Sequence, residues 1–169
     1  SECIKYLVKN LGKTVSEQVL TLNDTLAGYL TKMDMMCATS KGWDVTPDAV
    51  GIRYANVASS TDLSGVTDAT YKICIVELTE SNKYTRLNDV VKAYTACNEV
   101  YIYDDGSITS LDNLLNGNNA IAKSKITIFG IIDGYFINNT RTNHMFSGCS
   151  NLTSINLSGW DTSSVTAMN

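Results

Sequence analysis

The sequence predicts an α+β protein in which an N-terminal helical and mixed α+β region is followed by the start of a solenoid of strand-and-turn units. Apolar residues recur at helical spacing over residues 1–36, and apolar runs of strand length follow. Residues 145–169 form a patterned unit with weaker echoes from about residue 98. We therefore expect an anchoring or assembly domain over residues 1–97 and a repeat domain over residues 98–169.

The first 36 residues are expected to form a helical hairpin. Ile4, Leu7, Val8 and Leu11 share one helical face, because they are three or four residues apart, and Gly12 is placed to end this helix. A second helix is expected to begin at Thr14 or Ser16. Glu17 follows Thr14 by three residues, which is the spacing of a capping box.

Two interpretations of the second helix stay open. It packs on its own domain, or it is an assembly helix that docks into a larger structure or joins copies of the chain. Its apolar residues alternate by four and three, as in a coiled-coil seam. The candidate assembly residues are Val15, Val19, Leu22, Leu26 and Tyr29.

The middle of the chain predicts alternating strands and one helix. Residues 41–47, which include the single proline of the chain, are expected to form a loop or linker. Strands are expected over residues 50–57 and 71–78, where β-branched and aromatic residues gather. Residues 86–97 predict a helix whose apolar stripe consists of Leu87, Val90, Val91 and Tyr94.

The last part of the chain contains further short apolar runs. Residues 100–103 and 125–132 predict strands, and Ile155 and Leu157 alternate with polar residues as in a third. Val165 and Met168 are three residues apart, which favours a helical or 3₁₀ turn.

Residues 145–169 have the sequence MFSGCSNLTSINLSGWDTSSVTAMN. This run resembles one unit of the BspA-like leucine-rich repeat of bacterial surface proteins. That unit is roughly Met-Phe-x-Gly-Cys-x-x-Leu-x-x-Leu-x-Leu-Ser-x-Trp/Phe-Asp-Thr-Ser-x-Val-x-x-Met, followed by Met-Phe. Weaker echoes lie at residues 104–117 and 125–146, where Asp133 to Thr140 departs from the pattern. The chain ends about two residues before the next Met-Phe pair would fall. We therefore expect either that further repeats follow Asn169 or that something else covers the open end of the stack.

The resemblance implies a scaffold for contacts with other molecules and no catalytic role. It also implies a set of residues that form the repeat core. These are Met145, Phe146, Cys149, Leu152, Ile155, Leu157, Val165 and Met168.

Composition excludes several classes of function. The net charge of −4 and the pI near 4.9 argue against a nucleic-acid partner, which requires a basic face. No run of 18 apolar residues is present, so no membrane span is expected. The five cysteines show no Cys-x-x-Cys spacing and the one histidine is His144, so we expect reduced thiols and no metal site or cofactor.

Few residues suggest chemistry. His144 and Cys149 are five residues apart, but Cys149 occupies the cysteine position of the repeat, so we do not expect a nucleophile and base. Asp104, Asp105 and Asp112 lack the alternating ligands and final glutamate of a calcium loop and are expected to form turns.

These observations predict a non-enzymatic structural or attachment protein. Its N-terminal region docks into a larger assembly, and its repeats bind other protein subunits or a host-cell surface protein or glycan. Homo-oligomers are a further expectation. A phage virion component, such as a head or tail fibre at the virion surface, is slightly favoured because Ser1 suits a natural start and no export signal is visible. The alternatives are an exported bacterial cell-surface adhesin and a secreted effector or enzyme with a repeat targeting module.

Overall fold

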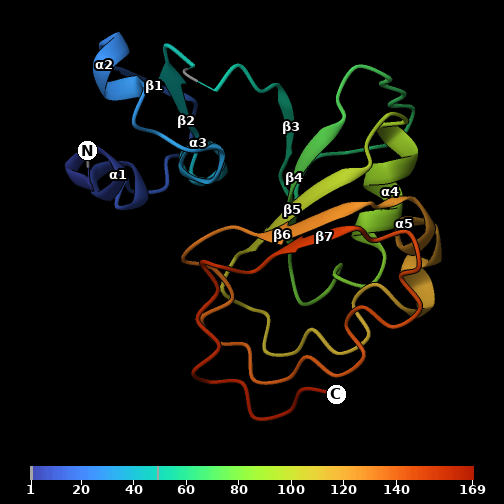
Figure 1. Ribbon diagram of the computed structural model, residues 1–169. Coiled ribbons are helices and arrows are strands. Elements are labelled where there is room, and N and C mark those ends of the chain that lie inside the picture. Colours follow the sequence, from blue (N-terminus) through green and yellow to red (C-terminus); the bar gives the residue numbers. More distant parts are fainter. Residues whose placement is uncertain (1, 49) are drawn as a thin grey trace. The chain divides into compact units, whose positions relative to one another are not determined.

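The computed structural model describes residues 2–48 and 50–169, which form two compact units that divide between Arg53 and Tyr54 (Figure 1). Each unit contains both helices and strands. The predicted domain boundary between residues 97 and 98 lies inside the second unit, immediately before a strand.

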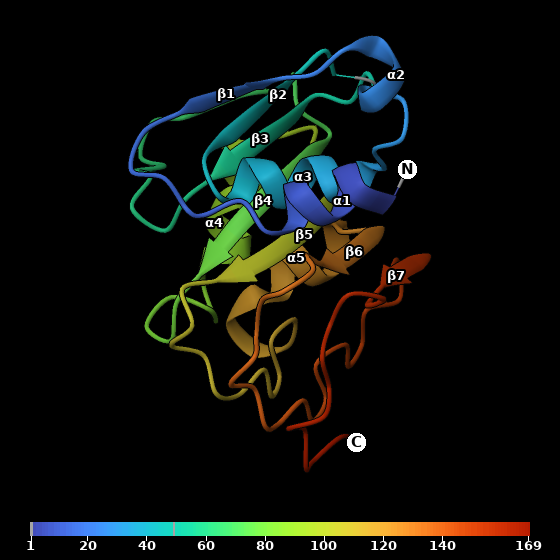
Figure 2. The ribbon, with the colours of Figure 1, turned by 90° about the vertical axis from the view of Figure 1, so that its left-hand side faces the viewer.

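The first unit contains three helices and a two-stranded parallel sheet. Its elements are α1 (Glu2–Lys9), β1 (Gln18–Thr21), α2 (Asp24–Ala27), α3 (Lys32–Ser40) and β2 (Trp43–Thr46). Figure 2 shows α1 beside α3, and β1 beside β2. The predicted first helix is confirmed as α1, in which Ile4 and Val8 are buried and Leu7 is exposed.

The predicted second helix is wrong, because its residues form a strand, a turn and one short helix. The Thr14 backbone N–H donates to the Lys41 carbonyl (2.9 Å), which carries this segment into parallel pairing with β2. The Asn23 side chain then accepts a hydrogen bond from the Leu26 N–H (2.9 Å) and begins α2. β-branched Val15, Val19 and Thr21 favour the strand over the helix.

The capping box lies at a different threonine from the one expected. The Thr31 hydroxyl accepts from the Asp34 N–H (3.3 Å), and the Asp34 carboxylate accepts from the Thr31 N–H (2.9 Å), so these residues begin α3. Residues 41–47, expected as a loop, contain β2, whose Trp43 indole N–H donates to the Gly12 carbonyl (2.8 Å).

The second unit is built on a five-stranded parallel sheet in the order β3-β4-β5-β6-β7. Its strands are β3 (Tyr54–Val57), β4 (Ile73–Leu78), β5 (Glu99–Asp104), β6 (Ile128–Ile131) and β7 (Ser154–Asn156). Its helices are α4 (Arg86–Ala93), the 3₁₀ helix η1 (Gly117–Asn119) and α5 (Ala120–Lys125). The strands predicted near residues 57, 75, 101, 129 and 156 are confirmed, as is the helix that begins at Arg86.

The predicted fold class is wrong. Instead of a mixed α+β region followed by a separate leucine-rich-repeat solenoid, strands from both predicted domains form one parallel sheet of an α+β or α/β protein. Pairing of β4 with β5 places Ile73 opposite Glu99 and joins the two predicted domains across the proposed boundary. The pair Val165 and Met168, expected on a helical turn, lies on either side of an isolated parallel bridge at Ala167.

The core of the second unit lies between one face of the sheet and the helices α4 and α5, which Figure 1 shows together on one side of the strands. The apolar residues of this face alternate along each strand, as the pleat requires. They are Cys74, Val76 and Leu78 in β4, Val100 and Ile102 in β5, and Phe129 and Ile131 in β6. Leu87 and Val90 of α4 and Ala122 of α5 are buried against them.

A buried asparagine fixes η1 against α4. The Asn119 amide group donates to the carbonyls of Lys83 (2.9 Å) and Leu114 (2.8 Å), and its oxygen accepts from the Asn88 N–H (3.2 Å). Because an unpaired buried carbonyl lowers stability by about 1–3 kcal/mol, this side chain holds the connection between β5 and α5 in place.

Gly130 in β6 leaves space for an aromatic ring on the neighbouring strand. A Cβ atom at this position would lie 2.5 Å from Cδ1 of Tyr101, whose hydroxyl is held by the Glu99 carboxylate (2.7 Å). We predict that Gly130→Ala lowers the free energy of unfolding by about 1–3 kcal/mol, because the ring must move. Urea unfolding is the measurement. Gly12→Ala, where a Cβ meets nothing within 4 Å, is the control and should change stability by less than about 0.5 kcal/mol. Equal effects of the two substitutions would contradict the packing.

Candidate functional site

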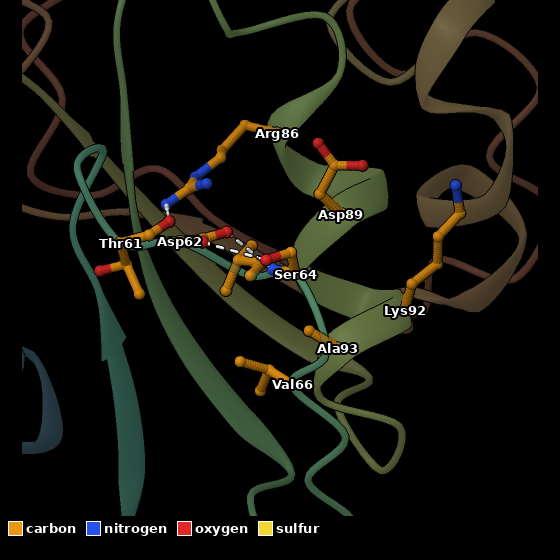
Figure 3. Close-up of a pocket in the computed structure, with 9 residues that line it drawn as sticks. Thr61, Asp62, Ser64, Val66, Arg86, Asp89, Lys92 and Ala93 are labelled. Carbon is orange, nitrogen blue, oxygen red and sulfur yellow. Dashed lines mark hydrogen bonds between the residues drawn. The ribbon is translucent and has the colours of Figure 1, made fainter.

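The second unit contains a polar pocket of about 420 Å³ between α4 and the loop that follows β3 (Figure 3). Arg86 extends from the start of α4 and donates hydrogen bonds to the carbonyls of Ala58 and Thr61, so it fastens the loop to the helix. Hydrogen bonds from the backbone N–H and the hydroxyl of Ser64 lower the pKa of the Asp62 carboxyl below its ordinary value.

The polar pocket has no arrangement suited to catalysis among its lining residues. Asp62 and Asp89 carry negative charge, Arg86 and Lys92 carry positive charge, and the lining contains neither histidine nor cysteine. The Ser64 hydroxyl donates to the Asp62 carboxylate on its own turn (3.0 Å), and the lowered pKa of Asp62 makes this carboxylate a weak base for it. We therefore interpret this pocket as non-catalytic.

A second feature is the set of hydrogen bonds that joins successive irregular segments of the chain. The Thr127 N–H donates to the Asn98 carbonyl (2.8 Å), and the Thr153 N–H donates in turn to the Thr127 carbonyl (2.8 Å). Each threonine hydroxyl donates to the same carbonyl as its own N–H. Segments far apart in sequence therefore run side by side below the strands, as Figure 1 shows in yellow, orange and red.

A second set of threonines makes the same kind of hydrogen bonds farther along each segment. The Thr140 N–H and hydroxyl donate to the Thr109 carbonyl (2.9 and 3.2 Å), and those of Thr166 donate to the Thr140 carbonyl (2.8 and 3.3 Å). We call the two sets the threonine ladders. In both, 26 residues separate the last two threonines.

Both ladders end at the outer edge of the unit, where residues 154–169 lie in Figures 1 and 2. Within the part of the chain that the structure describes, no donor reaches the carbonyl oxygens of Thr153 and Thr166. The corresponding carbonyls of Thr127 and Thr140 each accept three hydrogen bonds, two from backbone N–H groups and one from a threonine hydroxyl. The last segment therefore presents acceptors that earlier segments use to bind their neighbours.

An apolar pocket of about 370 Å³ opens at this edge. Its lining contains no Asp, Glu, Lys or Arg. Phe146, one of its lining residues, packs edge-on against Phe129 of the core, with 5.3 Å between the ring centroids. The lining residues are Thr142, His144, Met145, Phe146, Ser147, Leu157, Trp160, Met168 and Asn169. We call this pocket, β7 and the terminal carbonyls of the two ladders the β7 face.

Of the residues expected to form a repeat core, Met145, Phe146, Leu157 and Met168 line the apolar pocket, and Ile155 lies in β7. Met145 is buried. Phe146, Cys149, Leu152, Leu157 and Val165 are half-buried against the core of the second unit. Ile155 and Met168 are 45% and 63% exposed, so these two predicted core residues are surface residues in this structure.

The candidate assembly residues do not share one helical stripe. Val15 lies before β1, Val19 lies in β1, Leu26 lies in α2 and Tyr29 follows α2. Leu22 is half-buried between β1 and α2, whereas the other four residues are exposed. The prediction of a coiled-coil helix is therefore wrong, although four of its five residues lie on the surface of the first unit.

No disulfide bond joins any of the five cysteines, all of which lie among the described residues. Burial raises the pKa of the Cys149 thiol, which disfavours the nucleophilic thiolate. Cys74 and Cys97 share a hydrogen bond that raises the pKa of Cys74 and lowers that of Cys97, but both thiols are fully buried. Among the described residues, no group of three or more His, Cys, Asp or Glu is placed to hold a metal ion.

The chain matches no family model, no curated protein and no solved structure. Helices in the described ranges are too short or too polar to cross a bilayer.

Sequence reasoning missed the threonine ladders and the open β7 face. The 26-residue spacing of Thr127 with Thr153, and of Thr140 with Thr166, was a usable signal. This spacing was overlooked because the repeat pattern was followed through its apolar positions, whereas these threonines act through backbone and hydroxyl groups. The buried Arg86 had no such signal, since its environment comes from a loop that begins 28 residues earlier at Ala58.

Trp160 gives a direct test of how the apolar pocket is built. Its side chain is 8% exposed, and its indole N–H has no acceptor among the described residues. We predict that Trp160→Phe changes the free energy of unfolding by less than about 1.5 kcal/mol, because the ring stays and an unpaired donor is removed. Trp160→Ala should lower it by about 3–5 kcal/mol in urea unfolding. Equal losses in the two variants would show that the indole N–H has a partner and contradict the described environment.

Proposed function

We propose that this protein is a non-enzymatic structural or attachment protein. Its first unit docks into a larger assembly, and its second unit displays the β7 face as a binding surface. A phage virion component, such as a head or tail fibre at the virion surface, is the version we favour. The observation that carries the proposal is the β7 face, where β7 and an apolar pocket without Asp, Glu, Lys or Arg in its lining lie in the same part of the second unit.

Exposed apolar side chains support an assembly role for the first unit. Large apolar residues that are more than one-third exposed are Tyr6, Leu7, Val15, Val19, Leu26 and Tyr29. Such residues reduce solubility unless a partner covers them, and they are frequent here in a unit of about 50 residues. The two-stranded parallel sheet adds a second reason, because a pair of strands alone is marginally stable.

The character of the surface supports a contact role over catalysis. The polar pocket has balanced charges and neither histidine nor cysteine in its lining, and the lining of the apolar pocket contains no Asp, Glu, Lys or Arg. The acidic net charge disfavours nucleic acid as the partner. The resemblance of residues 145–169 to units of bacterial surface proteins supports an attachment role.

An exported bacterial cell-surface adhesin is the second candidate, and the same resemblance favours it. Identification of the N-terminal residue of the natively purified protein, together with its intact mass, separates the two candidates. A start produced by signal cleavage supports the adhesin. A start produced only by removal of the initiator methionine supports the virion component.

Assembly through the first unit is the testable core of this proposal. We predict that the chain self-associates, and that Val19→Asp combined with Leu26→Asp makes it monomeric. These side chains are 60% and 38% exposed, so the charges disrupt contacts between molecules and leave the fold intact. Size-exclusion chromatography with multi-angle light scattering measures the mass.

Ile121→Asp combined with Ile137→Asp is the matched control, because these residues are 43% and 62% exposed in the second unit. This control should assemble like the unchanged chain. An unchanged chain that is monomeric at all concentrations, or a Val19 and Leu26 variant that keeps its assembly, would refute the role of the first unit.

A further inference from the structure

We propose that the polar pocket between α4 and the loop after β3 binds an acidic monosaccharide unit. The carboxylate of this ligand pairs with Arg86, and its hydroxyl groups donate to Asp62 and Asp89. The pocket is separate from the β7 face, so the inference goes beyond the proposed function and adds a glycan to the ligands of the second unit.

Arg86 is a buried cation without an anionic partner. Its side chain is 8% exposed, and Figure 3 shows it extending from the start of α4 toward Thr61 and Asp62. Its Nη2 donates to the carbonyls of Ala58 and Thr61, whereas its Nε–H is buried and has no acceptor among the described residues. The part of the chain that the structure describes also contains no ion pair of Arg86. Because a buried charge is unfavourable unless it is paired, the pocket favours an anionic group of a ligand.

A carboxylate suits this position better than a phosphate. Asp62 and Asp89 line the same pocket, and their negative charges repel a dianion more strongly than a monoanion. Charge-assisted hydrogen bonds from a guanidinium to a carboxylate are among the stronger hydrogen bonds in proteins. The anionic group of the ligand is therefore expected to carry a single charge.

The two carboxylates of the lining are acceptors for hydroxyl groups. Asp62 accepts from the backbone N–H and the hydroxyl of Ser64 (2.8 and 3.0 Å), which leaves further lone pairs on both of its carboxylate oxygens. Asp89 is exposed and lies one turn after Arg86 on α4. Lys92 follows after another turn, and its positive charge disfavours an ammonium group on the ligand. The donors beside the carboxylate of the ligand are therefore hydroxyl groups.

The rest of the lining suits the C–H face of a sugar ring. Leu63, Val66 and Ala93 supply apolar surface beside the charged groups. The volume of about 420 Å³ lies within the range of small-molecule pockets, which is about 300–1,000 Å³. An acidic monosaccharide combines a carboxylate, several hydroxyl groups and an apolar ring face in one molecule of suitable size.

Sodium glucuronate is the probe, and amide NMR titration of the full chain measures its binding. We expect saturable shifts of the Ser64 and Arg86 amide signals. The methyl ester of glucuronate keeps the ring and its hydroxyl groups but lacks the charge, so it should bind at least about tenfold more weakly. Inorganic phosphate and glycine represent other anions and amino acids, and both should bind more weakly than glucuronate.

Lys92→Gln tests the site without altering the hydrogen bonds of Arg86. The substitution removes a positive charge from the lining, so it should weaken glucuronate binding about threefold and leave binding of the ester unchanged. Lys72→Gln is the matched control, because Lys72 is exposed and does not line the pocket, and it should bind like the unchanged chain. Arg86→Gln should weaken glucuronate binding by more than about tenfold, with circular dichroism as the check that the variant is folded.

The absence of saturable binding, equal binding of glucuronate and its ester, or equal effects of Lys92→Gln and Lys72→Gln would overturn the proposal. Tighter binding of phosphate or glycine at the same amides would also overturn it, because the occupant would then belong to another chemical class. Light scattering measures assembly through the first unit separately, so failure of this site and failure of the proposed function are distinguishable.

Discussion

The second unit depends on how its long connecting segments satisfy their backbone hydrogen-bonding groups. Long segments of irregular structure are uncommon in compact domains, because buried N–H and C=O groups need partners. Here the partner of each connecting segment is the corresponding segment beside it. Leu111 donates to Arg141, Thr142 donates to Ala167, and the threonine ladders repeat such bonds at both ends of each segment. Parallel strands normally require helical crossovers, but segment-to-segment bonding allows β6 and β7 to be joined without a long helix between them.

This constraint connects the fold to the proposed function. Bonds that pass from one segment to the next leave the outermost segment with open acceptors, and the apolar side chains beneath it remain partly uncovered. The sheet itself is secured by the core against α4 and α5. An edge strand beside an apolar pocket without Asp, Glu, Lys or Arg in its lining suits a contact surface, which is the role that we propose for the β7 face.

Local patterns predicted the strands well, because the alternation in residues 71–78 and 100–103 reflects a two-sided sheet. The prediction of a helix over residues 14–30 was wrong. Val19 and Leu26 have helical spacing, but β-branched residues near Val19 favour a strand, and Asn23 caps a separate short helix that contains Leu26. The single parallel sheet could not be predicted, since the pairing of Ile73 with Glu99 depends on contacts between segments that are distant in sequence. At the β7 face, apolar periodicity identified Phe146 and Leu157 but assigned the exposed Met168 to a core, because a pattern shows which residues share a face and not what covers it.

Amide hydrogen exchange measured by NMR on the intact chain tests the segment-to-segment bonding most directly. The amides of Leu111, Thr140, Thr142, Thr153 and Thr166 donate across segments and should exchange slowly. The amides of Ile137 and Asn138 lie in the same kind of irregular segment without a backbone acceptor, so they should exchange rapidly. Slow exchange confined to the first group would support the account. Equally rapid exchange in both groups would show that the connecting segments are not joined by these bonds, and would contradict both the fold and the β7 face built on it.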